Sequence, residues 1–254
     1  MRTAILNLSA LSTLLLAGCS FTTASGLSEC ETSAECGNDM VCSNNFCLPQ
    51  PAGCGQRYGD LSADAVQIGA ALPISLTTAP NSAKDASEEA GLNAILLALS
   101  EINDRGAAGK KLALNVCDTA ADPVLTSKQT EWLVNERKIV ALLTAGSSQT
   151  LAAAAITLPA NVLTMSSSAT SPELTRREDN TKLGLLWRTA PSDAIQGKVI
   201  ANLLLNDAEF SAVQRVGILY LDDAYGQGLF NVITEQLGTR RTTRAIPYAR
   251  PAAR

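Results

Sequence analysis

Hydroxyl-bearing side chains gather in two short stretches, each directly after an apolar run. Residues 139–143 (Ile-Val-Ala-Leu-Leu) lead into Thr-Ala-Gly-Ser-Ser at 144–148, and residues 160–164 (Ala-Asn-Val-Leu-Thr) lead into Met-Ser-Ser-Ser-Ala-Thr-Ser-Pro-Glu-Leu at 165–174. Hydroxyl groups both donate and accept hydrogen bonds, and the N–H groups at the start of a helix attract anions. The two stretches are therefore predicted to bind a small anionic or zwitterionic ligand.

The elements around these stretches must place them at one edge of a sheet. Apolar runs alternate with helical patterns: strands are predicted at residues 66–72, 112–116 and 139–143, and helices at 88–103, 125–136 and 150–158. This alternation predicts an α/β fold with a doubly wound parallel sheet, in which ligands bind at the carboxyl ends of the strands. A second lobe is predicted from a helix at 194–205, a strand at 215–220 and a helix at 227–237.

The N-terminus has the features of an export signal. Arg2 precedes an apolar core at residues 5–16, which is too short to span a bilayer. The run Leu-Ala-Gly-Cys that ends at Cys19 resembles the lipobox of bacterial lipoproteins, which implies that Cys19 is acylated and becomes the mature N-terminus. Ser20 then favours the outer membrane by resemblance to known sorting rules. The alternative is an ordinary signal peptide with Cys19 buried or paired.

The remaining six of the seven cysteines indicate disulfide bonds. Cys30, Cys36, Cys42 and Cys47 fall within eighteen residues, a density typical of a small disulfide framework in an exported chain, and they allow three pairings. A zinc site is disfavoured because there is no CxxC pair and no histidine. Parity alone suggests a bridge between the two other cysteines, Cys54 and Cys117.

The order of six motifs between about residues 66 and 237 resembles that of the type I periplasmic binding proteins, and most of all the leucine/isoleucine/valine-binding proteins of ABC transporters. The motifs are residues 98–106 (Ala-Leu-Ser-Glu-Ile-Asn-Asp-Arg-Gly), 117–123 (Cys-Asp-Thr-Ala-Ala-Asp-Pro), 145–148 (Ala-Gly-Ser-Ser), 166–174 (Ser-Ser-Ser-Ala-Thr-Ser-Pro-Glu-Leu), 187–193 (Trp-Arg-Thr-Ala-Pro-Ser-Asp) with Gln196-Gly197, and 223–228 (Asp-Ala-Tyr-Gly-Gln-Gly). The resemblance implies two lobes that close on a small molecule.

The resemblance also implies which residues hold the ligand. An amino-acid carboxylate would meet Ser147 or Ser148 and nearby N–H groups, and its ammonium would meet carbonyl and hydroxyl groups of the second stretch. Tyr225 would contribute from the other lobe. The ligand-binding set carried over by position is Ser147, Ser148, Ser168, Ala169, Thr170 and Tyr225. The alternatives are that both serines at 147–148 cap a helix and that Tyr225 rests on the surface of a turn.

Two further features are interpreted by resemblance or composition. Small disulfide knots on bacterial surface lipoproteins imply the pairs Cys30–Cys42 and Cys36–Cys47. Asp222 and Asp223 are expected to be turn and cap residues, because two adjacent carboxylates do not make a metal site.

The C-terminal residues depart from the family pattern. Residues 238–254 contain five arginines and no acid, namely Arg240, Arg241, Arg244, Arg250 and Arg254. We expect a truncated or frame-shifted product with an unpaired sheet edge in the second lobe. The expected parts are a lipoprotein signal peptide (1–18), a lipidated cysteine-rich neck and linker (19–53), a complete first lobe (54–190), a partial second lobe (191–238) and an atypical basic tail (239–254).

The motifs and composition described above also distinguish among the possible functions of the protein. The leading hypothesis is a lipid-anchored solute-binding protein that delivers amino acids or similar small polar ligands to an ABC permease. The second is a surface sensor or interaction module with a sensory partner, which the cysteine-rich neck favours. An enzyme is not expected: there is no histidine for a triad, no GxxxxGK[ST] motif and no outstanding pair of carboxylates. No cofactor or metal is expected, and a net charge of −4 gives no case for nucleic acid.

Overall fold

The structure is a computed structural model that describes residues 27–32, 35–36, 40–43, 45–79, 81–177 and 184–249. The chain divides into two compact units, residues 1–49 and 50–254, and each is described by itself. The expected signal peptide and Cys19 lie outside the described residues, as do Arg250 and Arg254.

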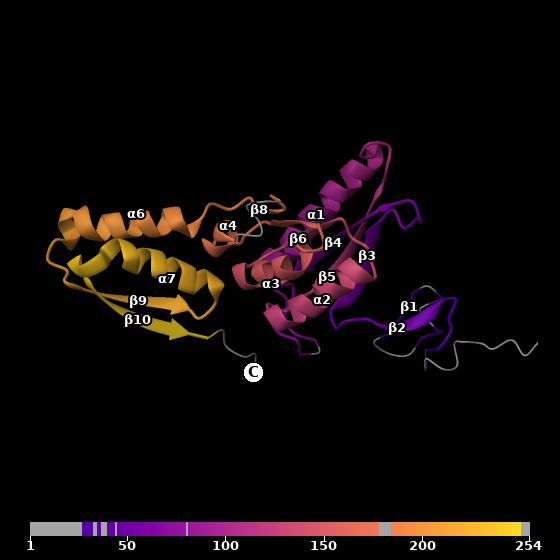
Figure 1. Ribbon diagram of the computed structural model, residues 1–254, viewed down its shortest axis with the longest axis horizontal. Coiled ribbons are helices and arrows are strands. Elements are labelled where there is room, and N and C mark those ends of the chain that lie inside the picture. The colour runs from indigo at the N-terminus through magenta and orange to yellow at the C-terminus, as the bar shows by residue number, and fades with distance from the viewer. Residues whose placement is uncertain are drawn as a thin grey trace, which may run out of the picture. The chain divides into compact units, whose positions relative to one another are not determined.

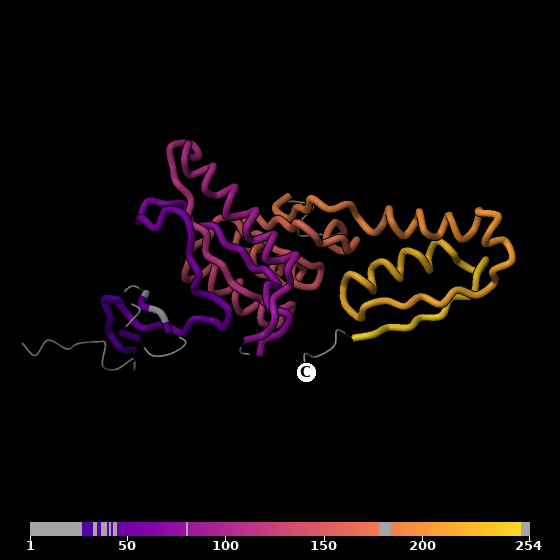
Figure 2. The backbone as a smooth tube through the Cα atoms, turned by 180° about the vertical axis from the view of Figure 1, so that it is seen from behind, coloured from indigo at the N-terminus to yellow at the C-terminus, as the bar shows by residue number. Residues whose placement is uncertain are grey.

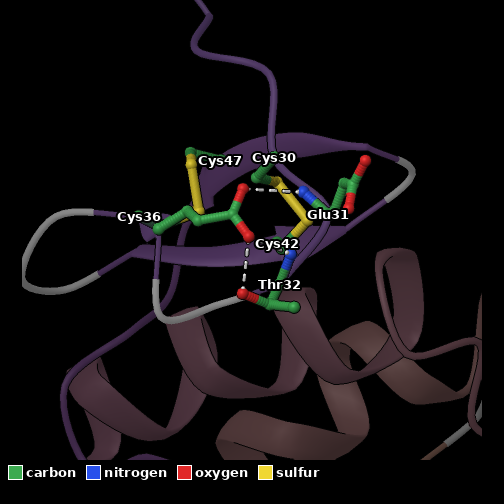
Figure 3. The surroundings of a disulfide bond; sticks show 7 residues. Cys30, Glu31, Thr32, Cys36, Cys42 and Cys47 are labelled. Atoms are coloured by element: carbon green, nitrogen blue, oxygen red, sulfur yellow. Dashed lines mark hydrogen bonds between the residues drawn. A yellow bond between two sulfur atoms is a disulfide. The ribbon is translucent and has the colours of Figure 1, made fainter.

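The first unit is built around two disulfide bonds. Strands β1 (Met40–Ser43) and β2 (Phe46–Pro49) pair antiparallel. The disulfides join Cys30 to Cys42 and Cys36 to Cys47, the pairs that the resemblance to small disulfide knots implies (Figure 3). Buried sulfur atoms supply the interior that so short a segment cannot build from apolar side chains.

The second unit contains a six-stranded sheet in the order β3-β5-β4-β6-β7-β8 (Figure 1). Its strands are β3 (Cys54–Gly59), β4 (Val66–Leu72), β5 (Leu112–Asp118), β6 (Ala141–Thr144), β7 (Leu163–Ser166) and β8 (Leu186–Arg188). Strands β5, β4, β6, β7 and β8 run parallel to one another, which confirms the predicted α/β class. Strand β3 runs antiparallel to β5. A disulfide joins Cys54 at the start of β3 to Cys117 of β5.

Helices cover both faces of this sheet. The helices are α1 (Ala86–Arg105), α2 (Pro123–Asn135), α3 (Ser147–Thr157) and the short α4 (Glu173–Arg176). Helix α1 packs its apolar side chains on Leu114 and Val116 of β5 and on alternate residues of β4. Gly69 of β4 faces the opposite side, where an added Cβ would lie 2.9 Å from Leu142 and 3.3 Å from Leu133 of α2. We call this sheet and its helices the first lobe.

The second lobe consists of α6 (Asp193–Asn206), β9 (Arg215–Leu221), α7 (Ala224–Leu237) and β10 (Thr242–Tyr248), with 3-10 turns at Ala208–Phe210 and Gly238–Arg240. Helices α6 and α7 lie side by side on one face of the β9–β10 pair, as Figures 1 and 2 show from opposite sides. Val216 and Ile218 of β9 pack under them. Residues 242–248, assigned from the sequence to a basic tail, pair in parallel with β9 as a strand.

Several boundaries differ from the prediction. The apolar run 160–164 lies only partly in a strand, because Asn161 has a φ of 57° in a turn and β7 begins at Leu163. Ser166, in the hydroxyl-rich stretch 165–174, is the last residue of that strand. Helix α3 begins at Ser147 rather than at Thr150. Among the described residues, no helix has both the length and the apolar character needed to cross a bilayer.

Candidate functional site

The loop after β6 turns directly into the first turn of α3. Gly146 is the N-cap residue and adopts a φ of 76°, which glycine reaches without strain. No side chain caps the helix, so the alternative that Ser147 and Ser148 act as capping residues is not what the structure shows. The N–H groups of the first turn lack intrahelical acceptors, and they point towards whatever lies in front of the helix.

The two hydroxyl-rich stretches bind each other through side chain to backbone hydrogen bonds. The buried Ser147 hydroxyl oxygen accepts from the N–H groups of Thr170 and Ser171, each at 3.2 Å. In return, the Gly146 N–H donates to the Ser168 hydroxyl at 3.0 Å. A serine oxygen that accepts a hydrogen bond keeps its own proton to donate, so both serines remain donors for a ligand anion.

Ala169 has a different place from its neighbours. Its side chain is fully buried in an apolar cluster with residues of α3 and α4, and its N–H donates to the Ser166 hydroxyl at 3.1 Å. The whole residue is inaccessible, and Ala169 is not among the residues that line the cavity described below.

Thr170 is paired with a carboxylate that was not singled out from the sequence. The Thr170 hydroxyl donates to Asp193 Oδ2 at 2.8 Å, and the Asp193 N–H donates to the Thr170 carbonyl at 2.9 Å. Arg188 Nη1 donates to the carbonyl oxygens of Thr170 and Ser171 at 3.0 and 2.7 Å. Because Thr170 gives its proton to Asp193, its oxygen is left as an acceptor.

Asp193 is fully buried at the start of α6. Burial raises the pKa of its carboxyl group above the usual value, an effect opposed by the Thr170 hydrogen bond and the charge of Arg188. Its Oδ1 atom is buried and has no hydrogen-bond partner among the described residues. Asp193 directly follows the N-cap Ser192, where acidic residues are common because they favour the start of a helix. Its contact with Thr170 could therefore not be recognised from the sequence.

The second lobe meets these loops at the start of α7. The Ala224 N–H donates to the Ser148 hydroxyl at 3.0 Å. Next to it, Tyr225 is 39% exposed, and its pKa is raised first by burial and then by the negative charges of Asp193 and Asp223. Asp223 is the N-cap of α7 and accepts from the Gly226 N–H, as expected for a cap residue. Ser148 thus binds the second lobe, whereas Ser147 binds the neighbouring loop.

A cavity of about 290 Å³ brings most of the predicted residues together. It is lined by Gly146, Ser147, Gln149, Ser168, Thr170, Asp223 and Tyr225. Donors lie on the α3 side, and acceptors lie around Thr170 and Asp223. The cavity can hold a small molecule with an anionic and a cationic end.

A metal site is not supported in the part of the chain that the structure describes. There, the sulfur atoms of Cys30, Cys36 and Cys47 form the one group of metal-type ligands within 4.8 Å of one another. All three sulfurs are in disulfide bonds, so no thiolate is available to a metal.

The comparisons with known proteins agree with one another, because each finds binding proteins. Residues 65–242 match the family model described as periplasmic binding protein. The chain is 29% identical over 134 residues to the chemotactic signal transduction system substrate-binding protein BasB of Halobacterium salinarum, covering 52% of this chain and 32% of BasB.

Solved structures share the fold. The leucine-binding protein LivK of Thermotoga maritima has a TM-score of 0.59 at 19% identity, over 73% of this chain and 49% of LivK. LivJ of Streptococcus pneumoniae, solved in complex with isoleucine, has a TM-score of 0.56 at 24% identity, over 75% of this chain and 51% of LivJ. A solute-binding protein of Rhodopseudomonas palustris, in complex with 3,4-dihydroxybenzoic acid, has a TM-score of 0.55 at 20% identity, over 72% of this chain and 47% of that protein. The chain spans about half the length of these structures and a third of BasB.

Proposed function

Since this chain belongs to the periplasmic binding protein family, we propose that it binds an amino acid, or a similar small zwitterion, in the cavity between the two hydroxyl-rich loops and Tyr225. The observation that carries this proposal is the separation of donors and acceptors across one cavity. The first turn of α3 and the hydroxyl groups of Ser147 and Ser168 donate, whereas the Thr170 oxygen accepts next to the buried Asp193.

Each end of the ligand is matched by one side of the cavity. The α-carboxylate lies against the N–H groups at the start of α3, where the helix dipole also favours negative charge. The α-ammonium donates to Thr170, whose oxygen is held as an acceptor by Asp193. Asp193 contributes negative charge behind Thr170 and is a positioning residue for that hydroxyl.

Three ligands of the same shape separate these contributions. Thermal unfolding of the chain from Ser20 would be followed with leucine, with 4-methylpentanoate, which lacks the ammonium, and with 3-methylbutylamine, which lacks the carboxylate. Leucine at about a hundred times its dissociation constant should stabilise the native state by about 2.7 kcal/mol. Equal effects of all three compounds, or no effect of any amino acid in a broad panel, would refute the proposal.

A matched pair of variants tests the ammonium subsite. Thr170→Ser keeps the hydroxyl and should retain the leucine response, whereas Thr170→Val removes it and should lower the affinity about tenfold or more, because the ammonium loses its acceptor. If Thr170→Val binds leucine as well as Thr170→Ser does, the ammonium lies elsewhere.

The cellular role we propose is that of an exported protein, anchored by lipid on Cys19, that delivers its ligand to an ABC permease. Palmitate labelling of the protein, lost in Cys19→Ala, would test the anchor. Loss of amino-acid uptake on deletion of the gene would test delivery.

Sensing is the second candidate, and the resemblance to a chemotactic binding protein favours it. The same cavity would then report ligand occupancy to a signalling partner. A deletion strain that keeps amino-acid uptake but loses its response to amino-acid gradients would favour this role over transport.

A further inference from the structure

Two arginines lie on the face of the sheet opposite α1, away from the loops of the ligand cavity. Arg57 of β3 is paired in register with Asn115 of β5. In β5, Leu114 and Val116 face α1, so Asn115 and Arg57 face the side of α2. Arg137 follows the end of α2, two residues before Ile139, at the amino end of β6. The cavity described above lies at the carboxyl ends of the strands.

Neutral amide groups hold Arg57 in place. Its Nε donates to Asn115 Oδ1 at 3.2 Å, and its Nη2 donates to Gln67 Oε1 at 3.5 Å. Asn115 Nδ2 donates to the same Gln67 oxygen at 3.1 Å, which links the three side chains across β3, β5 and β4. No carboxylate is part of this network, so these contacts do not neutralise the Arg57 guanidinium by an ion pair.

Arg137 is held by stacking rather than by hydrogen bonds. Its Cζ lies 4.9 Å from the ring centroid of Trp132, which is almost fully buried. Its Nε is buried and has no hydrogen-bond partner among the described residues. The pKa of Arg137 is lowered first by burial and then by the positive charge of Arg57, and the nearby Glu136 only partly opposes this.

Neither arginine forms a salt bridge with a residue that the structure describes; the salt bridge found there joins Lys84 to Glu89, and Glu136 acts on Arg137 only through its nearby charge. The segments that carry the two arginines meet at Gln67: its Oε1 accepts from Arg57, and its carbonyl accepts at 3.0 Å from the N–H of Val140, three residues after Arg137. Cations held this near each other repel, and a buried guanidinium donor without an acceptor is unfavourable. An oxyanion would relieve both, because the planar guanidinium donates two parallel hydrogen bonds to a phosphate or carboxylate group.

We propose that Arg57 and Arg137 form a binding site for a small phosphate-class oxyanion at the amino end of the first-lobe sheet, separate from the amino-acid cavity. Trp132 stacks under one guanidinium, and Asn115 with Gln67 orients the other. The disulfide from Cys54 to Cys117 fixes the strand that carries Arg57.

Trp132 provides a direct signal for occupancy. The chain has two tryptophans, so Trp187→Phe leaves Trp132, under the Arg137 guanidinium, as the single tryptophan, which can be excited at wavelengths that tyrosine does not absorb. This variant of the mature chain would be titrated with inorganic phosphate at neutral pH, with sodium chloride holding the ionic strength constant. We expect a saturable change in emission with phosphate and none when chloride alone is varied.

Substitutions assign the response to the two arginines. Arg57→Gln and Arg137→Gln should each weaken phosphate binding about tenfold or more, because each removes charge-assisted donors. Arg137→Lys keeps the charge but loses the planar fork, and should weaken binding less than Arg137→Gln. Lys128→Gln removes an exposed positive charge from α2 and should change nothing.

Three outcomes would overturn the proposal. These are no saturable response to phosphate, a response that persists in both glutamine variants, and an equal response to acetate, which would assign the site to carboxylates instead. Far-UV circular dichroism of each variant shows whether it has folded, and Arg137→Lys carries the test if a glutamine variant has not. Because the readout is independent of leucine, failure here would not bear on the amino-acid cavity.

Discussion

Leu142 in the first lobe has no exposed surface, whereas Leu219 in the second lobe is 67% exposed. Both are leucines in strands of parallel sheets. Leu142 lies between β4 and α2 in a sheet with helices on both faces. Leu219 points away from α6 and α7, and Ile195, Val199 and Leu203 of α6 are also largely exposed. The difference shows that burial in this chain is set by how many layers cover a sheet, and not by residue type.

The largest effect we expect comes from a bond that only the first lobe contains. Replacing both Cys54 and Cys117 by serine opens a link between residues separated by 63 positions in the sequence. The chain-entropy model gives a loss of about 4 kcal/mol in the free energy of unfolding. Urea unfolding followed by tryptophan fluorescence measures it, since both tryptophans lie in the second unit. The control, Cys36→Ser with Cys47→Ser, should leave this transition unchanged.

Truncating the two leucines tests the comparison directly. Leu142→Ala should lower the free energy of unfolding by about 3 kcal/mol, because it leaves a cavity in a closely packed interior. Leu219→Ala should change it by less than about 0.5 kcal/mol, because its side chain is already in solvent. Similar losses in both variants would mean that the outer face of β9 is covered in solution.

The same glycine substitution should have opposite signs in the two lobes. A Cβ on Gly197 of α6 would lie 2.6 Å from Val232 Cγ1 of α7, so Gly197→Ala should lower stability by about 1–2 kcal/mol. A Cβ on Gly91 of α1 would meet nothing within 4 Å, so Gly91→Ala should raise stability by about 0.5–1 kcal/mol. Thermal midpoints of both variants measure the signs, and a gain in Gly197→Ala would show that α6 can move off α7.

The smallest effect concerns Asp193, where the two lobes join. Its pKa is raised in the folded state, so the native protein binds more protons than the unfolded chain above the ordinary aspartate pKa of 3.8. Stability contributed by the protonated form is therefore lost as the pH rises from that value through the raised pKa. Asp193→Asn should not show this loss. Identical pH dependence of the urea midpoint in both proteins would mean that Asp193 titrates normally.

Much of the first lobe is predictable from its sequence because each parallel strand is a short apolar run and each helix has one apolar face. Strand β3 is not, since Gln56 and Arg57 give it no apolar pattern and glycines flank it. Its position is set by its partner β5, which lies more than fifty residues away in the sequence. Long-range pairing of this kind leaves little local trace.

The location of the candidate site can be predicted from the sequence, but the hydrogen bonds between its residues cannot. Ser147, Ser168, Thr170 and Tyr225, all predicted from the sequence as ligand-binding residues, line one cavity in the structure. The sequence cannot show that Ser147 accepts from the opposite loop, because a serine before a helix is equally suited to capping. Nor does it distinguish Asp193 from an acid that favours a helix start. Hydroxyl groups have several partners within reach, and only the folded geometry selects among them.

The disulfide at the start of β3 also has a mechanical consequence. If the chain is tethered at its N-terminus, tension enters the second unit through the residues just before Cys54. The bond to Cys117 passes that load to β5, which is paired on both sides, before any hydrogen bond of β3 is stretched. The edge strand therefore cannot be unzipped from its first residue, and under such tension the first lobe can bear the pull without losing its outermost strand.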